Sequence, residues 1–139
     1  MATLKTNTLT GTSTAGSIAV TGEGNSTTTN LQQGLAKCWL QSSDSAGITD
    51  SLNIASGTDN GTGDYTFAIS NDMANSTYSI VSTASQSSGN SPVISCNPTN
   101  DTNSTSVYRL QVGLTTNGSG GAYTDIDKLN YSAVFGDLA

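Results

Sequence analysis

The chain has 139 residues, a formal net charge of −6 and 34% hydrophobic residues, which suffices for one domain with a modest core. Only four residues are Lys or Arg, which excludes proteins that neutralise nucleic-acid phosphates or bind anionic membranes. No His is present, and no apolar run approaches the ~20 residues of a membrane-spanning helix. We therefore expect no cofactor, no nucleic-acid partner and no membrane insertion.

The residue mix favours strands and turns over helices. Thr, Val, Ile and Tyr suit pleated surfaces, whereas Ser, Asn and Gly suit turns, and no helical period of useful length occurs. The chain start lacks the charged-then-apolar pattern of a secretory signal. We therefore expect an all-β protein made in the cytoplasm, which stays there or leaves as part of an assembly.

Residues 1–30 are rich in Thr and poor in apolar side chains, so this segment cannot close a core by itself. Its apolar anchors are Leu4, Leu9, Ile18 and Val20. Such a segment becomes ordered by adding a strand to a sheet or by docking on a partner. We favour an extended N-terminal attachment arm that docks on other chains, and an edge strand of its own domain is the alternative.

The domain expected over residues 31–139 is organised around 34–69, where three strand-forming runs are joined by Gly, Asn and Asp. In the first run, 34–41, alternation places Leu35, Lys37 and Trp39 on one face and Ala36, Cys38 and Leu40 on the other. Both faces carry apolar residues. Either two sheets of a sandwich cover this strand, or Trp39 faces a neighbouring subunit.

The other two runs of this stretch also alternate. Residues 50–54 place Leu52 and Ile54 on one face. The following run places Tyr65, Phe67 and Ile69 on one face. Between them, Asp59-Asn60-Gly61 tolerates positive φ and predicts a hairpin turn. The three runs together predict a β-meander.

The rest of the chain adds four strands and three polar loops. The strands are expected over 77–84, 92–96 at a sheet edge, 106–116 as the longest, and about 129–136. The residues expected on the buried face of the longest strand are Tyr108, Leu110, Val112 and Leu114. The loops cover 85–91, 97–104 and 117–121, with Ser87, Asn90, Asn100, Asn103 and Asn117 as exposed contact residues. Seven or eight short strands predict a small antiparallel β-sandwich.

A subunit interface is expected on two of these strands. Val107, Arg109 and Gln111 form a mixed face of the longest strand, suited to water or to a subunit contact. A closed cyclic assembly would cover Trp39 and the Arg109 face together. The predicted interface residues are Leu35, Trp39, Val107 and Arg109.

Catalysis and metal binding lack the residues they need. There is no His and no Gly-x-Ser-x-Gly nucleophile motif, so we expect the protein not to be an enzyme. Asp125 and Asp127 could form a carboxylate pair, but a solvated stretch explains them more simply. Cys38 and Cys96 are expected as free buried thiols, with a disulfide as the alternative. The loop 59–64 resembles a calcium loop superficially and is fully explained as a hairpin.

Four segments resemble small fibre-type virion proteins of tailed phages of marine bacteria, including cyanophages. They are Ala2-Thr3-Leu4-Lys5-Thr6-Asn7-Thr8-Leu9, Gly34-Leu35-Ala36-Lys37-Cys38-Trp39, residues 50–54 with 58–66, and Val134-Phe135-Gly136-Asp137. Two positions depart from that family, which usually has Ala at Cys38 and Phe at Leu52. The resemblance implies a β-sandwich displayed on the particle as a homotrimer and attached to capsid or tail proteins by its N-terminal segment.

Three functions are therefore compared. The first is a fibre- or spike-type virion appendage that presents its polar loops to the host surface, where a glycan is a possible partner. The second is a capsid decoration or cement protein that uses the same arm. The third is a carbohydrate-binding module with aromatic stacking surfaces from Trp39, Tyr65, Tyr78, Tyr108, Tyr123 and Tyr131. Virion structure is favoured, because most of these aromatic residues fall on predicted core positions.

Overall fold

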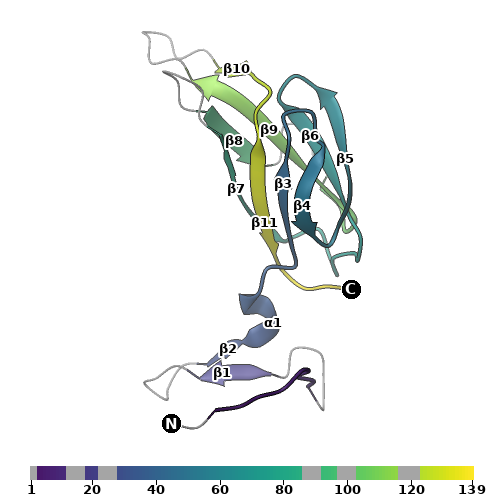
Figure 1. The fold of residues 1–139 in the computed structure, drawn as a ribbon, viewed down its shortest axis with the longest axis vertical. Helices are drawn as coiled ribbons and strands as arrows, with labels where there is room; N and C mark the ends of the chain where they lie inside the picture. Colours follow the sequence, from purple (N-terminus) through teal and green to yellow (C-terminus); the bar gives the residue numbers. More distant parts are fainter. Residues whose placement is uncertain (1–2, 12–17, 22–27, 86–91, 97–102, 116–122) are drawn as a thin grey trace. The chain divides into compact units, whose positions relative to one another are not determined.

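A computed structural model describes residues 3–11, 18–21, 28–85, 92–96, 103–115 and 123–139, with the backbone alone for 92–96 and 115. The chain divides into two compact units, Met1–Leu35 and Ala36–Ala139. The sandwich domain is predicted to start at Leu31, whereas the second unit starts at Ala36. Figure 1 shows the elements of both units.

The N-terminal unit holds a short hairpin and one helical turn. Strand β1 (Ala19–Thr21) pairs antiparallel with β2 (Thr28–Asn30), and α1 (Leu31–Gly34) follows directly. The Asn30 Oδ1 atom accepts from the backbone N–H groups of Gln32 and Gln33 at 2.8 and 3.2 Å, which caps this turn. Within the described residues, the strands of this unit pair only with each other, so the alternative of an edge strand in the sandwich is not found.

The second unit is an all-β sandwich, as predicted (Figure 1). Its described residues form β3 (Cys38–Ser42), β4 (Ile48–Leu52), β5 (Ile54–Gly61), β6 (Asp64–Ile69), β7 (Ser79–Ala84), β8 (Pro92–Cys96), β9 (Val107–Thr115), β10 (Tyr123–Asp125) and β11 (Asn130–Phe135). One antiparallel sheet has the order β4-β3-β11-β7. The other has the order β10-β9-β6-β5, and β8 pairs with β9 alone. The predicted edge position of 92–96 is therefore confirmed.

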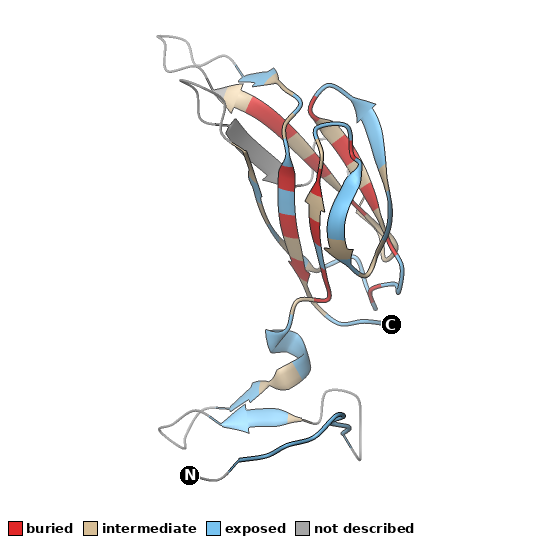
Figure 2. Ribbon diagram, in the orientation of Figure 1, coloured by how far each residue is buried: buried red, intermediate tan, exposed pale blue. Residues whose placement is uncertain are grey.

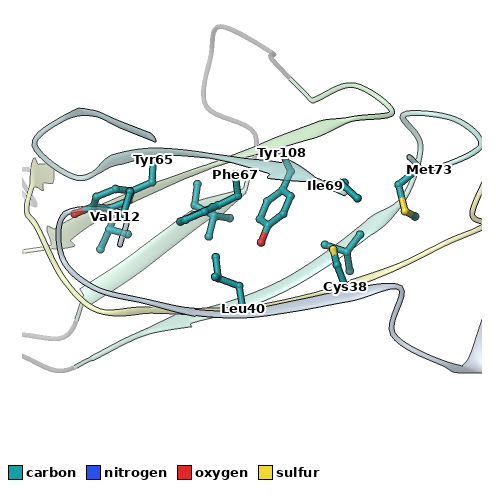
Figure 3. Close-up of a cluster of buried hydrophobic side chains, with 11 residues drawn as sticks. Cys38, Leu40, Tyr65, Phe67, Ile69, Met73, Tyr108 and Val112 are labelled. Atoms are coloured by element: carbon teal, nitrogen blue, oxygen red, sulfur yellow. The ribbon is translucent and has the colours of Figure 1, made fainter. Parts of the chain in front are cut away.

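The hydrophobic core lies between the two sheets (Figures 2 and 3). Its buried members are Cys38, Leu40, Ala46, Tyr65, Phe67, Ile69, Met73, Tyr108, Leu110, Val112 and Val134. The alternation predicted for β6 and β9 is confirmed, except that Leu114 is only half-buried. Because β6 and β9 are neighbours and both turn aromatic residues inward, the ring centroids of Phe67 and Tyr108 lie 5.5 Å apart.

The predicted strand over 50–54 is wrong, because the chain changes sheets in its middle. Asn53 has φ of 59°, a left-handed conformation that ends β4 and starts β5 in the other sheet. Leu52 is therefore exposed, whereas Ile54 packs against the core. The strand predicted over 34–41 also starts later, at Cys38, because Leu31–Gly34 form α1.

The predicted hairpin is present, but its turn lies further along the chain. Gly61 pairs with Asp64, so Thr62 and Gly63 form a two-residue loop between β5 and β6. Gly61 and Gly63 have φ of 138° and 69°, values that non-glycine residues rarely adopt. The turn therefore uses both glycines, and a register shift between Asp59 and Gly61 accommodates Asn60 as an extra residue of β5.

Cys38 is a free cysteine in this core, so the disulfide alternative is not supported. Burial raises the pKa of its thiol to about 11, which keeps it protonated at neutral pH. We expect iodoacetamide at pH 8 to leave Cys38 unlabelled in the folded protein and to label it in urea. Mass spectrometry of the peptide that contains Cys38 measures this, and rapid labelling without denaturant would contradict the buried placement.

Candidate interaction surface

One row of apolar side chains crosses the outer face of the four-stranded sheet. Burial alternates along β3 and β11, so Trp39 and Ala133 point away from the core. In the sheet register Leu52 lies opposite Trp39, Trp39 opposite Ala133, and Ala133 opposite Val81. These four residues, which we call the apolar row, therefore reach from the edge strand β4 to the edge strand β7.

Three of the four residues of the apolar row are exposed. The exposed fractions are 61% for Val81, 49% for Leu52 and 38% for Trp39, while Ala133 is half-buried. Single exposed apolar residues are ordinary, but a contiguous group indicates an interaction site. The row therefore favours the alternative in which Trp39 faces a neighbouring subunit, because the second sheet of the sandwich packs on the other face of this sheet.

The side chains beside the apolar row are almost uncharged. The neighbouring row across the same strands is Asp50, Gln41, Tyr131 and Thr83, and Tyr131 is exposed. Asp50 is the single charged residue in β3, β4, β7 and β11 together. The chain has a net charge of −6, but the four strands of this sheet carry only the Asp50 carboxylate, on the edge strand β4.

The opposite outer face, on the five-stranded sheet, is polar. Arg109 of β9 forms a two-point ion pair with Asp64 of β6 through its Nε and Nη2 atoms. The hydrogen bond and charge of Arg109 lower the pKa of the Asp64 carboxyl. Beside them, Gln111 Nε2 donates to Asp125 Oδ1 at 3.2 Å. These four polar side chains therefore have partners within their own sheet.

The predicted subunit interface is therefore not one surface. Val107 and Arg109 alternate with the inward Tyr108 on β9, so they lie on the outer face of the five-stranded sheet. Trp39 lies on the outer face of the other sheet, and Leu35 ends the N-terminal unit. The sequence alone could not predict that Leu52, Val81 and Ala133 lie in one row with Trp39, because this row depends on the pairing of the strands.

Asp125 and Asp127 do not form a carboxylate pair. Asp127 Oδ1 accepts from the Gly63 backbone N–H at 2.7 Å and from the Tyr65 hydroxyl at 3.0 Å, whereas Asp125 accepts from Gln111. Burial, followed by the hydrogen bond to Asp127, raises the pKa of Tyr65. The two carboxylates thus hold separate parts of the sandwich together, which is a structural role.

The aromatic residues divide into a buried and an exposed group. Tyr65 and Tyr108 are fully buried, and the Tyr78 hydroxyl donates to the Val107 carbonyl at 2.7 Å. Trp39, Tyr123 and Tyr131 are exposed. Tyr65 and Tyr108 cannot stack on a sugar from these positions, and Tyr78 is half-buried against the core, so only part of the aromatic set proposed for a carbohydrate-binding module is accessible to a ligand.

The predicted contact loops are described only in part. Ser87, Asn90, Asn100 and Asn117 lie outside the described residues. Asn103, predicted as exposed, is half-buried, and its Oδ1 atom accepts from the Arg109 backbone N–H at 3.0 Å. Asn103 therefore holds the start of β9 and is not a free contact group.

The described residues contain no cluster of three or more His, Cys, Asp or Glu side chains that could hold a metal ion. No helix among them is long and apolar enough to cross a membrane. Comparison of the chain with protein-family models, with curated proteins and with solved structures found no match.

Proposed function

We propose that the protein is a structural component of a tailed-phage particle, a fibre- or spike-type appendage made in the host cytoplasm. Its N-terminal unit attaches to other virion proteins, and its sandwich is displayed toward the host surface, as a homotrimer in keeping with the resemblance described above. The proposed role is structural and involves no catalysis. Polar loops on a rigid sandwich suit such a role, because they can vary without unfolding the core.

The observation that carries this proposal is the exposure of the N-terminal unit. None of its described residues is buried (Figure 2), while Leu4, Leu9 and Val20 are exposed, with an exposed fraction of 80% for Leu4. Fixing a backbone opposes folding by roughly 1–2 kcal/mol per residue, and this unit has little apolar burial of its own to offset that. A segment of this kind gains its order by docking on a partner, as an attachment arm does.

The segments that carry the phage resemblance occupy structural positions. Residues 58–66 form most of the β5–β6 hairpin, and Val134 with Phe135 ends β11. Residues 50–54 contain the crossing between the sheets at Asn53. These residues shape the sandwich, which suits a displayed building block.

We expect loss of the arm to abolish attachment and to leave the sandwich folded. The chain lacking residues 1–35 should remain soluble, with the circular dichroism of a β protein, and should be absent from particles produced in infected cells. In the full-length chain, Leu4→Ser with Leu9→Ser should reduce incorporation, because two of the three exposed apolar anchors are lost. Immunoblotting of purified particles measures both.

A matched control for this experiment is Thr6→Ser with Thr8→Ser, which changes the same segment without removing an apolar side chain. The control should be incorporated like the unmodified chain. If the chain lacking residues 1–35 were still found on particles, the attachment role of the N-terminal unit would be wrong.

Two other functions remain as alternatives. A capsid decoration protein would use the same arm and is separated from an appendage by copy number, since it covers the capsid surface whereas an appendage occupies a few sites. A carbohydrate-binding module is weaker. Its support is Tyr123, whose exposed ring lies so close to Gly113 that a Cβ there would be 2.3 Å from the ring. A glycan array with the Tyr123→Ala variant as control decides it.

A further inference from the structure

We infer that the apolar row is a contact between copies of this chain, in which the Leu52 end of one row packs against the Val81 end of a second copy's row. The inference rests on the proposed role as a self-associating particle protein, and it names the surface and the residue pair that join the copies. It replaces Val107 and Arg109, which lie on the opposite outer face, with Leu52, Val81 and Ala133.

The distribution of charge favours a second copy of this chain as the partner that covers the apolar row. Each copy carries a net charge of −6, so two copies that approach through acidic surfaces repel each other. Asp50 is the single charged residue in the four strands of this sheet, and it stands on the edge strand β4. This face therefore lets two copies meet with little like-charge repulsion. A basic partner would find a single carboxylate, that of Asp50, in the four strands of this face.

The order of side-chain sizes along the row is self-complementary. From β4 to β7 it runs Leu52, Trp39, Ala133, Val81. If a second sheet is turned over about an axis parallel to the strands, Trp39 lies over Ala133 and Leu52 lies over Val81. A large ring thus meets a small methyl group, as close packing of two aligned sheets requires.

The same residue pair forms in a trimer. When three copies place this face toward a threefold axis parallel to the strands, the β4 edge of one copy lies beside the β7 edge of the next. Leu52 then again approaches Val81 of a neighbour. The Leu52–Val81 contact is therefore common to these two closed arrangements, and it can be tested before the choice between dimer and trimer is known.

The size of the face sets the strength of the contact. Four strands about 4.8 Å apart and about 3.3 Å per residue give a face of roughly 19 by 18 Å, or about 350 Å² in plan per copy. This is below the ~800 Å² per partner of a standard stable interface. We therefore expect reversible, concentration-dependent association in which Trp39 contributes the largest share.

The test is a charge exchange at the two ends of the row, followed by sedimentation velocity on the full-length chain from low to high micromolar concentration. The unmodified chain should increase in mass with concentration. Leu52→Lys and Val81→Asp should each weaken association by at least about tenfold, since each places an unpaired charge in an apolar contact. The double variant Leu52→Lys/Val81→Asp should recover most of this loss, because every copy then offers a Lys to a neighbour's Asp.

The matched control is Thr58→Lys on β5, which adds the same charge to the outer face of the other sheet. It should associate like the unmodified chain, and circular dichroism should show that every variant is folded. Trp39→Ala should give monomers. A monomeric unmodified chain at all concentrations, an unrecovered double variant, or equal weakening by Thr58→Lys would each overturn the inference.

Failure of this inference is distinguishable from failure of the proposed function. Association of the purified chain does not require a phage particle, and attachment to the particle is measured by incorporation of the arm variants. A chain that associates through the row but is never found on particles would retain the interface and refute the function. A chain that is incorporated but stays monomeric would retain the attachment role and refute both the interface and the homotrimer.

Discussion

Replacing Gly63 with alanine is expected to reduce the free energy of unfolding by about 4 kcal/mol or more. The alanine would be strained in the left-handed conformation, and its methyl group would also clash with backbone atoms. Gly63 has φ of 69°, and a Cβ there would lie 2.2 Å from the Val112 carbonyl oxygen and 2.9 Å from the Ile126 backbone nitrogen. Both obstacles are backbone atoms. They cannot rotate away as the end of a long side chain could.

Relaxation around the new methyl group would also break hydrogen bonds. The Val112 N–H donates to the Gly63 carbonyl at 2.7 Å, and the Gly63 N–H donates to Asp127 Oδ1 at 2.7 Å. Moving the turn outward would lengthen both, and the second bond also holds the carboxylate that accepts from buried Tyr65. The strain therefore spreads from the hairpin into the contact between β6 and the segment that follows β10.

The matched control is Gly61→Ala in the same hairpin. Gly61 also has positive φ, at 138°, but a Cβ there meets nothing within 4 Å. Its loss should be limited to backbone strain of about 1–3 kcal/mol. Urea unfolding followed by the fluorescence of Trp39, the single tryptophan, compares the two variants. Equal unfolding midpoints would show that the close approach at Gly63 contributes nothing.

The sequence predicts those parts of the fold in which the alternation of residues within a single strand identifies the buried face. On β6 the inward residues Tyr65 and Phe67 alternate with Thr66 and Ala68, and on β9 Tyr108 alternates with Arg109. Large apolar residues at every second position suffice to choose the buried face. The same information cannot say which strand lies beside which, because pairing depends on residues far away in the chain.

The candidate surface could not be predicted for that reason. Val81 and Leu52 are ordinary members of two separate runs until the register places them in line with Trp39. Asp127 is expected in a solvated stretch, whereas its carboxylate accepts from Gly63 and Tyr65, far earlier in the chain. Local spacing could not identify those partners.

Asn53 illustrates the same limit and carries the second large effect. The alternation of Leu52 and Ile54 predicts one strand, but Asn tolerates the left-handed conformation better than other non-glycine residues, and here it turns the chain from one sheet into the other. We expect Asn53→Ala to lower the free energy of unfolding by about 3 kcal/mol, from lost hydrogen bonds and from strain in a left-handed alanine.

The hydrogen bonds explain the size of this effect. Asn53 Nδ2 donates to the carbonyls of Lys37 and Asn71, each at 3.1 Å, and Oδ1 accepts from the backbone and side-chain N–H groups of Asn71 at 2.7 and 2.9 Å. One side chain thus joins the start of β3 to the segment after β6. The Asn53 carbonyl adds a bond from the Ser70 N–H at 3.1 Å. The link is local to the place where the chain passes between the sheets.

Three variants separate the two contributions to the loss at Asn53. Asn53→Gly keeps the left-handed backbone and loses only the side-chain bonds, so it should be more stable than Asn53→Ala by about 1 kcal/mol. Asn53→Asp keeps the acceptor for Asn71 but turns a carboxylate oxygen toward two carbonyls, so it should not recover the loss at neutral pH. Asn71→Ala removes a single side-chain bond and should lose only about 1 kcal/mol. Thermal unfolding followed by circular dichroism ranks the set, and an Asn53→Ala variant no less stable than Asn71→Ala would mean that this crossing is held by the packing of the sheets and not by Asn53.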